Sequence, residues 1–429
     1  MTKMIRGETV SFDADPDGIT HHEKGALVIG DDGRILWHGA FSGLPPRYAT
    51  LPCDDYTGCL VMPGLIDAHI HFPQYRMLAA PGKDLLDWLT RFTFPEEARY
   101  ADAGYAAMAA EIFLDRLAAN GTTAALVFSS VHKVAADALF AAAEKRGLAL
   151  ITGKTMMDRD VPEGVRDDAE TSARESEELY RKWHGRGRLR YAVTPRFAVT
   201  SSEAQLRLAG ELLQSLPEAL MQTHLSESHA ELVRVAELYP NDRDYTAVYE
   251  RFGLLGPRSL FAHGIHLSER ELTALSEAGS TVVHCPTSNT FLGSGLMSMK
   301  ERKSADRPVN LAVATDIGGG TSYSMLTTLG EAYKVQMLAG YKPSAIELFR
   351  LATRGNAAQL GLGVDIGSLE FGHFADIVVI DPRATPVLAA RHDLSQSLED
   401  VLFSLMILGD DRAIRATYVQ GRKIHEKKP

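Results

Sequence analysis

The sequence predicts an α/β protein, a (β/α)8 TIM-like barrel with a small β-sandwich domain built from both termini. Two patterns indicate this fold. Residues 61–365 alternate short apolar strands with longer stretches of helical periodicity, which is the rhythm of a β/α barrel. Residues 1–60 and 366–429 instead hold short strand-like runs between turn-forming residues. We expect these two terminal segments to meet as one β domain.

The terminal segments contain apolar runs too short for long helices. In the first segment, GALVIG at 25–30 and GCLVMPG at 58–64 are separated by turn signals of the kind seen in DADPDG at 13–18. The last segment returns to this pattern with GSLEFGHFADIVVIDP at 367–382 and AIRATYVQGRKIHE at 413–426. Runs of this length, bounded by Asp, Gly and Pro, predict strands joined by tight turns.

In the central segment, apolar runs end in polar residues before a helical stretch begins. TAALVFSS at 123–130 precedes VHKVAADALFAAAEKRG at 131–147, and RYAVTPRF at 190–197 precedes SSEAQLRLAGELLQSL at 201–216. Apolar residues three and four apart give each such stretch one buried face. Strands that alternate with helices in this way predict a parallel sheet closed into a barrel.

Composition excludes two classes of partner. The 429-residue chain has no apolar run close to the roughly 18 residues of a membrane span, so we expect no membrane partner. The net charge of −10 comes from interspersed acidic residues, which argues against binding to nucleic acid polymers. The N-terminus lacks the apolar core of a secretory signal, and three cysteines without a C-x-x-C pair fit a reducing compartment. We therefore expect a cytoplasmic protein.

Two histidines, His69 and His71, close the apolar run in PGLIDAHIHFPQYRM at 63–77. Alternate residues of a strand point to the same side, so both imidazoles can reach one ion. Later apolar runs also end in groups that can bind a metal, namely His224, His263, His284 and Asp316. Because barrel active sites lie at the carboxyl ends of the strands, this repetition predicts a metal site. Imidazoles with one carboxylate suit zinc.

With these residues the chain resembles the metal-dependent amidohydrolase superfamily. The shared motifs are GLIDAHIH at 64–71, the single histidines at 224 and 263, ATD at 314–316 and GHFADIVVID at 372–381. The spacing His224-x-x-Glu227 and the segment HCPTSN at 284–289 are similar to the aminohydrolases, which remove ammonia from heterocycles.

A narrower resemblance is to the guanine deaminases. It is carried by four segments, HFPQYRMLA at 71–79, DLLDWLTRFTFPEE at 84–97, TPRF at 194–197 and TDIGGGTS at 315–322. The resemblance implies that guanine and water are converted to xanthine and ammonia, and that the protein is a homodimer.

The resemblance also implies one zinc ion per chain, with ligands His69, His71, His224 and Asp316. The catalytic residues that it implies are Glu227, Asp316 and His263. Asp316 is expected to accept a proton, and Glu227 to carry it to the ring nitrogen and the departing ammonia. His263 is expected to orient the attacking group or to stabilise the tetrahedral intermediate.

The predicted substrate-binding residues are Gln74, Arg196, Phe197, His224, Glu227 and Trp88. Gln74 offers both a donor and an acceptor, and Arg196 offers a planar fork of donors, so both suit the polar edge of a base. Phe197 would wall or stack on the ring. The segment with Trp88, Phe92 and Phe94 is either a lid over the site or ordinary core packing.

Several alternatives stay open at this point. The substrate could be another purine such as 8-oxoguanine, or a triazine, and a carboxylated Lys154 could bridge two metals in a cyclic amidohydrolase. A metal-binding scaffold without activity is a third reading. His229 and Glu231 mimic the H-x-E of other zinc deaminases, but no P-C-x-x-C follows, so we expect both on a helix surface. His284 and Asn289 are expected to shape the site or to hold a loop.

Overall fold

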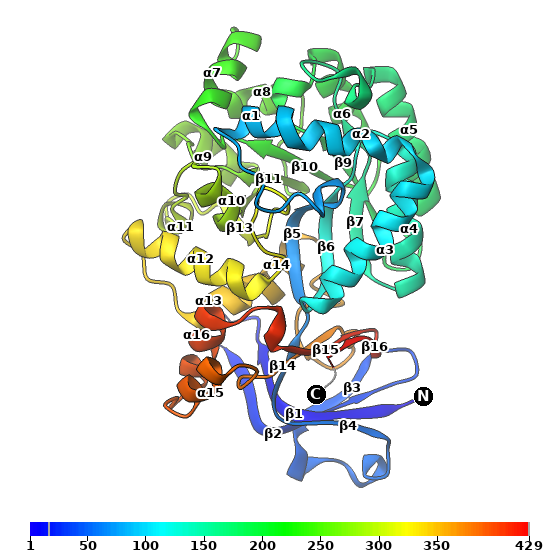
Figure 1. Cartoon of the computed structure of the whole chain (residues 1–429), viewed down its shortest axis with the longest axis vertical. Helices are drawn as coiled ribbons and strands as arrows, with labels where there is room; N and C mark the ends of the chain where they lie inside the picture. Colours follow the sequence, from blue (N-terminus) through cyan, green and yellow to red (C-terminus); the bar gives the residue numbers. More distant parts are fainter. Residues whose placement is uncertain (16–17, 428–429) are drawn as a thin grey trace.

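The computed structural model describes residues 1–15 and 18–427, which form a barrel and an adjoining sheet (Figure 1). Among these residues, eight parallel strands make the barrel, in the order β13-β12-β11-β10-β9-β7-β6-β5, and the short β8 (Thr155–Met156) pairs with β9. The barrel strands are β5 (Leu65–His71), β6 (Thr122–Phe128), β7 (Ala149–Gly153), β9 (Arg190–Pro195), β10 (Leu220–Leu225), β11 (Ser259–His263), β12 (Thr281–His284) and β13 (Asn310–Val313). The predicted fold class is confirmed.

Backbone hydrogen bonds join the two ends of this strand order. Asp316 N donates to His69 O at 3.0 Å, and His71 N donates to Ile317 O at 2.7 Å. The segment that follows β13 therefore lies against β5, and the metal-binding side chains predicted on both come to the same mouth of the barrel.

Helices surround the barrel and cover its carboxyl end. Their bounds are α1 (Leu85–Trp88), α2 (Phe94–Ala98), α3 (Ala103–Ala119), α4 (Lys133–Arg146), α5 (Ala169–Trp183), α6 (Glu203–Ser215), α7 (His229–Leu238), α8 (Tyr245–Arg251), α9 (Glu269–Glu277), α10 (Pro286–Phe291), α11 (Met299–Arg302), α12 (Met325–Leu338), α13 (Ala345–Arg350) and α14 (Asn356–Gln359). Many begin at a capping side chain: Ser202 caps α6, and Ser228 and Ser268 form capping boxes on α7 and α9. These caps set the residue at which each helix begins.

The barrel interior is filled by small and branched apolar side chains. One buried cluster draws members from all eight barrel strands: Ile66, Ala68, Ala124, Leu126, Ala149, Ile151, Ala192, Leu220, Leu260, Ala262, Val283, Ala312 and Ala314. Ala357, Leu360, Leu362 and Ile366 pack against it from the chain that follows the barrel. The interior is therefore a packed core that supports the polar groups at its carboxyl end.

Strands from both ends of the chain form a second sheet below the barrel (Figure 1). In the described part of the chain it has seven strands, in the order β16-β15-β14-β4-β1-β2-β3. They are β1 (Lys3–Phe12), β2 (Ile19–Ile29), β3 (Ile35–Ala40), β4 (Cys53–Pro63), β14 (Ile377–Ile380), β15 (Ile414–Val419) and β16 (Arg422–Glu426). The terminal segments meet as expected, through the antiparallel pair β4 and β14. Hydrogen bonding makes them one continuous sheet, and the expected boundary at residue 60 falls inside β4.

The C-terminal segment also contains two helices that the sequence did not predict, α15 (Pro386–His392) and α16 (Leu398–Leu408). Ser397 caps α16 by accepting a hydrogen bond from Asp400 N at 3.2 Å. The helix buries Leu402 and Leu405 in the main core, where it packs against α12 and α13. It therefore joins the C-terminal segment to the barrel.

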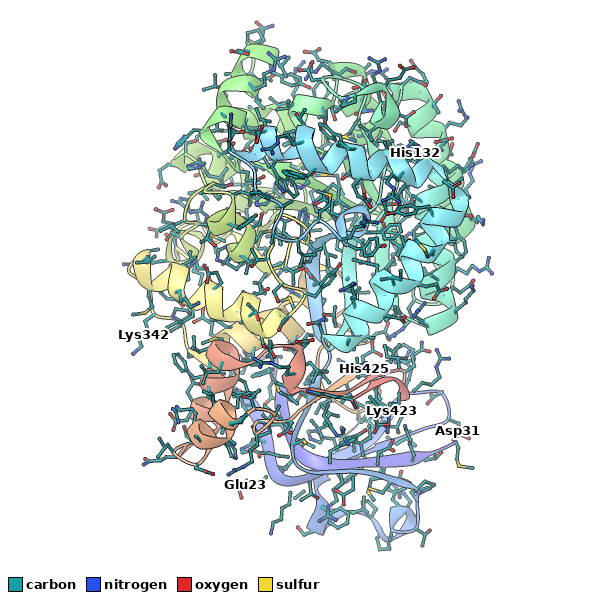
Figure 2. All side chains as sticks on the ribbon, in the orientation of Figure 1. Glu23, Asp31, His132, Lys342, Lys423 and His425 are labelled. Atoms are coloured by element: carbon teal, nitrogen blue, oxygen red, sulfur yellow. The ribbon has the colours of Figure 1, made fainter. Side chains whose placement is uncertain are left out.

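Charged side chains such as those of Glu23, Asp31 and Lys342 project from the outer surface (Figure 2). No helix in residues 1–15 and 18–427 is long and apolar enough to cross a membrane.

Candidate active site

Barrel geometry brings the predicted metal ligands together. His69 and His71 lie at the end of β5, and His224 is the second-last residue of β10. His263 is the last residue of β11, and Asp316 follows β13 by three residues. These five side chains come from strands that are far apart in sequence, and all of them are buried.

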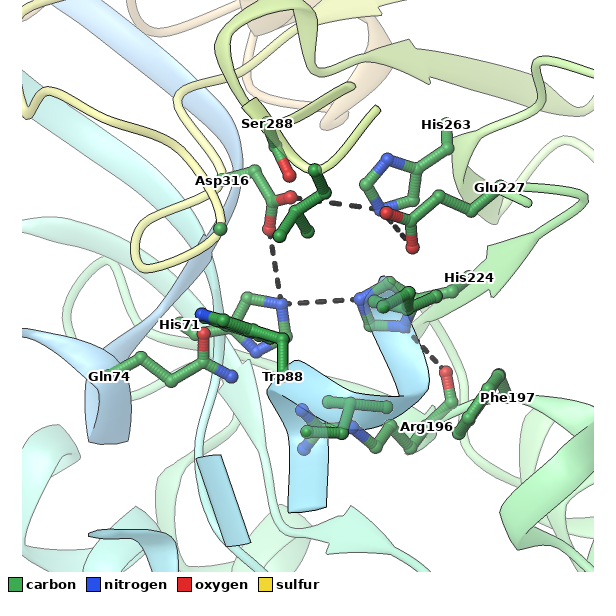
Figure 3. Close-up of a pocket in the computed structure, with 14 residues that line it drawn as sticks. His71, Gln74, Trp88, Arg196, Phe197, His224, Glu227, His263, Ser288 and Asp316 are labelled. Carbon is green, nitrogen blue, oxygen red and sulfur yellow. Dashed lines mark hydrogen bonds and ion pairs between the residues drawn. The ribbon is translucent and has the colours of Figure 1, made fainter. Parts of the chain in front are cut away.

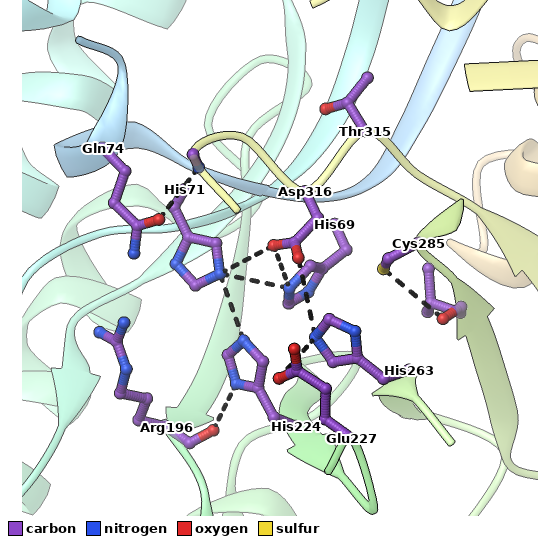
Figure 4. Close-up of polar contacts among 12 residues, drawn as sticks. His69, His71, Gln74, Arg196, His224, Glu227, His263, Cys285, Thr315 and Asp316 are labelled. Atoms are coloured by element: carbon purple, nitrogen blue, oxygen red, sulfur yellow. Dashed lines mark hydrogen bonds and ion pairs between the residues drawn. The ribbon is translucent and has the colours of Figure 1, made fainter. Parts of the chain in front are cut away.

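Four of the five form a compact set of donor atoms (Figure 4). His71 Nε2 lies 3.2 Å from His69 Nε2, 3.2 Å from His224 Nε2 and 3.3 Å from Asp316 Oδ1. His69 Nε2 lies 3.2 Å from the same Asp316 oxygen. Ligands at about 2.0–2.1 Å from a tetrahedral zinc ion are separated by about 3.3–3.4 Å. The residues present therefore fit a zinc ion.

The charge states of these groups also suit a cation. Burial lowers the pKa of His71 to about 3 and that of His224 well below its usual value. Both rings are neutral at pH 7, as metal ligands must be. Although burial opposes its ionisation, the adjacent His69 and His71 imidazoles hold the pKa of Asp316 well below the usual range. The set thus offers imidazole lone pairs and one carboxylate.

His263 lies at the edge of this set, between two carboxyl groups. Its Nε2 is 3.4 Å from Glu227 Oε2 and 3.7 Å from Asp316 Oδ2. Its Nδ1 is 2.8 Å from Asn289 Oδ1, which can only accept, so Nδ1 carries the proton and Nε2 faces the site. The ligand atoms of His69, His224, His263 and Asp316 all lie within 4.8 Å of one another. Asn289 therefore shapes the site by orienting His263.

Two of these residues have left-handed backbone conformations, with φ of 72° at His263 and 52° at Asp316. Side chains with a Cβ adopt this region at a cost, and such strain concentrates at functional sites. Both strained residues belong to the group of side chains that can hold a metal ion.

Glu227 follows β10 by two residues and is fully enclosed. Its backbone N donates to Glu231 Oε2 at 2.8 Å, and its side chain accepts a hydrogen bond from Ser294 Oγ at 3.1 Å. Burial, together with the negative charge of Asp316, raises the pKa of Glu227 to about 8. A carboxyl group with such a pKa can hold or release a proton near neutral pH.

A cavity of about 370 Å³ opens above these groups (Figure 3). It is lined by His71, Gln74, Leu85, Trp88, Leu89, Arg196, Phe197, His224, Glu227, His263, Ser288, Leu292, Asp316 and Gly319. The predicted catalytic, metal-binding and substrate-binding residues all line this cavity except His69, which lies against His71. Leu85 and Leu89 belong to the segment that was expected to be a lid, whereas Ser288, Leu292 and Gly319 were not predicted.

Of the three aromatic residues in the expected lid, only Trp88 is among the lining residues. It ends α1, which leads through a π-helical turn at Leu89–Thr93 into α2, so 85–98 is a continuous helical segment over the barrel mouth. Phe94 is buried in the main core, and Phe92 packs against that core. The segment therefore contributes both to the cavity wall and to core packing.

Gln74 and Arg196, the predicted base-binding residues, share one partner that the sequence did not reveal. Gln74 Nε2 donates to Glu97 Oε1 at 3.0 Å, and Arg196 Nη1 donates to both Glu97 oxygens at 2.9 Å. Gln74 Oε1 accepts from Gly318 N at 3.0 Å. Glu97 lies within a recognised sequence segment, but only the fold places it beside Arg196.

The expectations for Glu231 and His284 need correction or refinement. Glu231, expected on a helix surface, is completely buried and accepts hydrogen bonds from Glu227 N and Tyr245 Oη, whereas His229 is exposed as expected. The capping box that begins α7 draws Glu231 inward. His284 does not line the cavity and approaches Gln336 instead.

Lys154 lies away from the donor set. Its Nζ binds the Val131 carbonyl oxygen and Asp167, and Glu175 lies 3.4 Å away. These partners do not line the cavity, so the geometry gives no support to a carboxylated lysine that bridges two metals.

Comparison with known proteins shows the family of this chain. Residues 60–424 match the profile of the amidohydrolase family. The chain belongs to the amidohydrolase family. This amidohydrolase is 47% identical over 406 residues to a guanine deaminase of Escherichia coli (strain K12), covering 94% of this chain and 92% of the relative. The resemblance to the guanine deaminases is thereby confirmed.

Solved structures of two deaminases have the same fold as this chain. A guanine deaminase from C. acetobutylicum with bound guanine in the active site superposes with a TM-score of 0.90 at 31% identity, covering 99% of this chain and 100% of that one. An adenosine deaminase from Xanthomonas campestris with bound zinc superposes with a TM-score of 0.85 at 23% identity, covering 98% and 92%. At that identity the second likeness concerns the fold alone.

Proposed function

We propose that this amidohydrolase catalyses the hydrolytic deamination of guanine to xanthine and ammonia, with one zinc ion per chain. The observation that carries the proposal is the convergence, in one cavity, of a metal-binding set, an enclosed Glu227 and the polar pair Gln74 and Arg196. A relative with 47% identity over nearly the whole chain is named guanine deaminase, which supports the same substrate.

The residues that would hold the zinc ion are His69, His71, His224 and Asp316. When bound, zinc lowers the pKa of water from about 15.7 to about 7, which supplies a nucleophile at neutral pH. The chain orients one of these ligands through its own backbone: His224 Nδ1 donates a hydrogen bond to the carbonyl oxygen of Arg196 at 2.7 Å, which leaves Nε2 free for the metal.

Glu227 is the proposed proton carrier. Its carboxyl group faces His263 and the cavity, and its raised pKa lets it take up a proton and pass it on at neutral pH. The acceptors are N3 of the base and then the leaving amine at C2. Replacement of that amine by oxygen yields xanthine, and the departing group leaves as ammonia.

Gln74 and Arg196 are the proposed readers of the base, and Phe197 and Trp88 its apolar walls. If C2 faces the metal-binding set and N3 faces Glu227, the N1–H and C6=O edge remains for polar recognition. A carbonyl oxygen accepts from the Arg196 guanidinium, and N1–H donates to Gln74 Oε1. The apolar walls exclude water from the reacting atoms.

We also propose two properties that the resemblance implies. The protein is a homodimer, which sedimentation or light scattering would test. It works in the cytoplasm, a reducing compartment that suits the three free thiols Cys53, Cys59 and Cys285.

The test is product stoichiometry with zinc quantified in the same preparation. The proposal predicts one xanthine and one ammonia for each guanine consumed, and activity that falls with zinc removal and returns with zinc. Guanine left unchanged by zinc-loaded protein would contradict it.

A further inference from the structure

Glu97 is a completely buried carboxylate on α2 that touches both proposed base-binding residues. It accepts one hydrogen bond from Gln74 and two from Arg196, all at 2.9–3.0 Å. It does not line the cavity. Whatever Glu97 contributes to substrate recognition, it must therefore contribute through these two side chains.

The first consequence concerns the orientation of the Gln74 amide. A carboxylate only accepts and a backbone N–H only donates, so Glu97 and Gly318 N together allow a single orientation, with Nε2 toward Glu97 and Oε1 toward Gly318. The second lone pair of Oε1 and the second hydrogen of Nε2 are then fixed as well. Gln74 lines the cavity with its acceptor and donor already assigned.

The second consequence concerns Arg196. Its Nη1 is held by Glu97, and its backbone oxygen accepts from His224 Nδ1. Among the described residues, no hydrogen bond from Arg196 Nε or Nη2 is formed, so these nitrogens keep their donors for a ligand. Phe94 lies on the same helix as Glu97, α2, and the centre of its ring is 5.8 Å from the guanidinium carbon of Arg196. Arg196 is thus held from two sides before a ligand arrives.

We propose that Glu97 is a positioning residue that sets the base specificity of this site, an inference that rests on the proposed function. By fixing Gln74 and Arg196, it presents an acceptor and donors that match the N1–H and C6=O edge of a 6-oxopurine. A 6-aminopurine presents the opposite pattern, with an acceptor at N1 and a donor at the 6-position. It would leave buried polar groups unpaired, which strongly disfavours binding.

A suitable competitor for guanine is 2,6-diaminopurine. It carries the same 2-amino leaving group and differs from guanine at the N1 and C6 edge. Its hydrolysis at C2 consumes one water and gives one ammonia and 6-amino-2-oxopurine. The ratio of kcat/KM for guanine to that for 2,6-diaminopurine therefore measures edge recognition separately from the chemistry at C2.

The experiment compares Glu97→Gln and Glu97→Asp with the parent enzyme, with zinc quantified in each. Glutamine keeps the shape but presents a donor as well as an acceptor, so it no longer fixes the orientation of the Gln74 amide from this side. Aspartate keeps the charge but is too short to contact both Gln74 and Arg196. If Glu97→Gln does not fold, Glu97→Asp provides the test. We expect retained zinc, and a guanine preference that falls by roughly tenfold or more in a folded variant.

Glu271→Gln is the matched control, because Glu271 is also a buried glutamate that accepts several hydrogen bonds, from Thr246 and Ser268, away from the cavity. It should lower stability and leave the guanine preference unchanged. The inference would be overturned if both Glu97 variants kept the preference for guanine over 2,6-diaminopurine, or if Glu271→Gln lost it equally. Either result would leave the guanine activity of the parent enzyme, and with it the proposed function, intact. A parent without guanine activity would overturn the proposed function and this inference together.

Discussion

The Nδ1 of His224 donates a hydrogen bond to the backbone oxygen of Arg196 at 2.7 Å. A predicted metal ligand and a predicted base-binding residue are thus joined by one contact, and Arg196 continues the connection to Glu97 through its guanidinium. The orientation of the imidazole and the position of the base-reading group therefore depend on the same short segment after β9. Metal binding and substrate recognition can nevertheless be separated by variants that remove one side chain at a time.

Removing one metal ligand should abolish both zinc binding and activity. His71→Ala or Asp316→Ala leaves the donor set one ligand short, because the two side chains each contribute an atom to it, 3.3 Å apart. We expect zinc to fall from about one per chain to near zero, as measured by elemental analysis beside ammonia release. The exposed His229→Ala serves as the control and should keep both. An active His71→Ala protein with full zinc would rule out this ligand assignment.

Glu227→Gln should retain zinc and lose turnover. The amide keeps the shape of the side chain but cannot exchange a proton, so kcat should fall by roughly 10²-fold or more. Steady-state kinetics on zinc-quantified protein provides the measurement, and the exposed Glu237→Gln is the control. Near-normal turnover would remove Glu227 from the mechanism.

Arg196→Ala should weaken guanine recognition and also destabilise the protein. Loss of the donor should lower kcat/KM for guanine by the equivalent of about 2–4 kcal/mol. It also leaves the Glu97 carboxylate buried with one partner fewer, so unfolding free energy should fall by about 3–5 kcal/mol. Guanine kinetics and urea unfolding measure the two effects, with the exposed Arg207→Ala as the control. Unchanged guanine kinetics in both Arg196→Ala and Gln74→Ala would contradict the recognition scheme.

Lys154→Met tests the two-metal alternative directly. If Lys154 only pairs with Asp167, the variant should keep its zinc content and lose about 3 kcal/mol of stability, because a largely buried carboxylate loses its partner. Elemental analysis and denaturant unfolding distinguish a lysine that pairs with Asp167 from a carboxylated lysine that bridges two metals. A parent with two metals per chain and a variant with none would instead favour a bridging lysine.

Much of the barrel could be predicted because its periodicities are local. Apolar runs, helical spacing and turn residues are all readable within a window of some 15 residues. The helix α16 was missed between two strand-like segments, although Ser397 and Asp400 give a capping signal that could have found it. The continuity of the terminal sheet depends on pairing between β4 and β14, more than 300 residues apart, which no local pattern encodes.

The candidate site could likewise be predicted only in part. His69, His71, His224, His263 and Asp316 could be recognised because each ends a strand or follows one closely, and barrel topology brings such positions together. Glu97 and Ser294 could not be recognised from the sequence. Their partners, Arg196 and Glu227, lie 99 and 67 residues away, and no sequence motif marks either contact.

The identity of the substrate can be tested with a panel of bases. Zinc-quantified protein would be given guanine, 8-oxoguanine, adenine, cytosine and melamine, and kcat/KM would be measured by ammonia release. We expect the highest kcat/KM for guanine, with xanthine as the product, and little turnover of adenine, whose amine lies at C6 and not at C2. A higher value for adenine or for a triazine would contradict it.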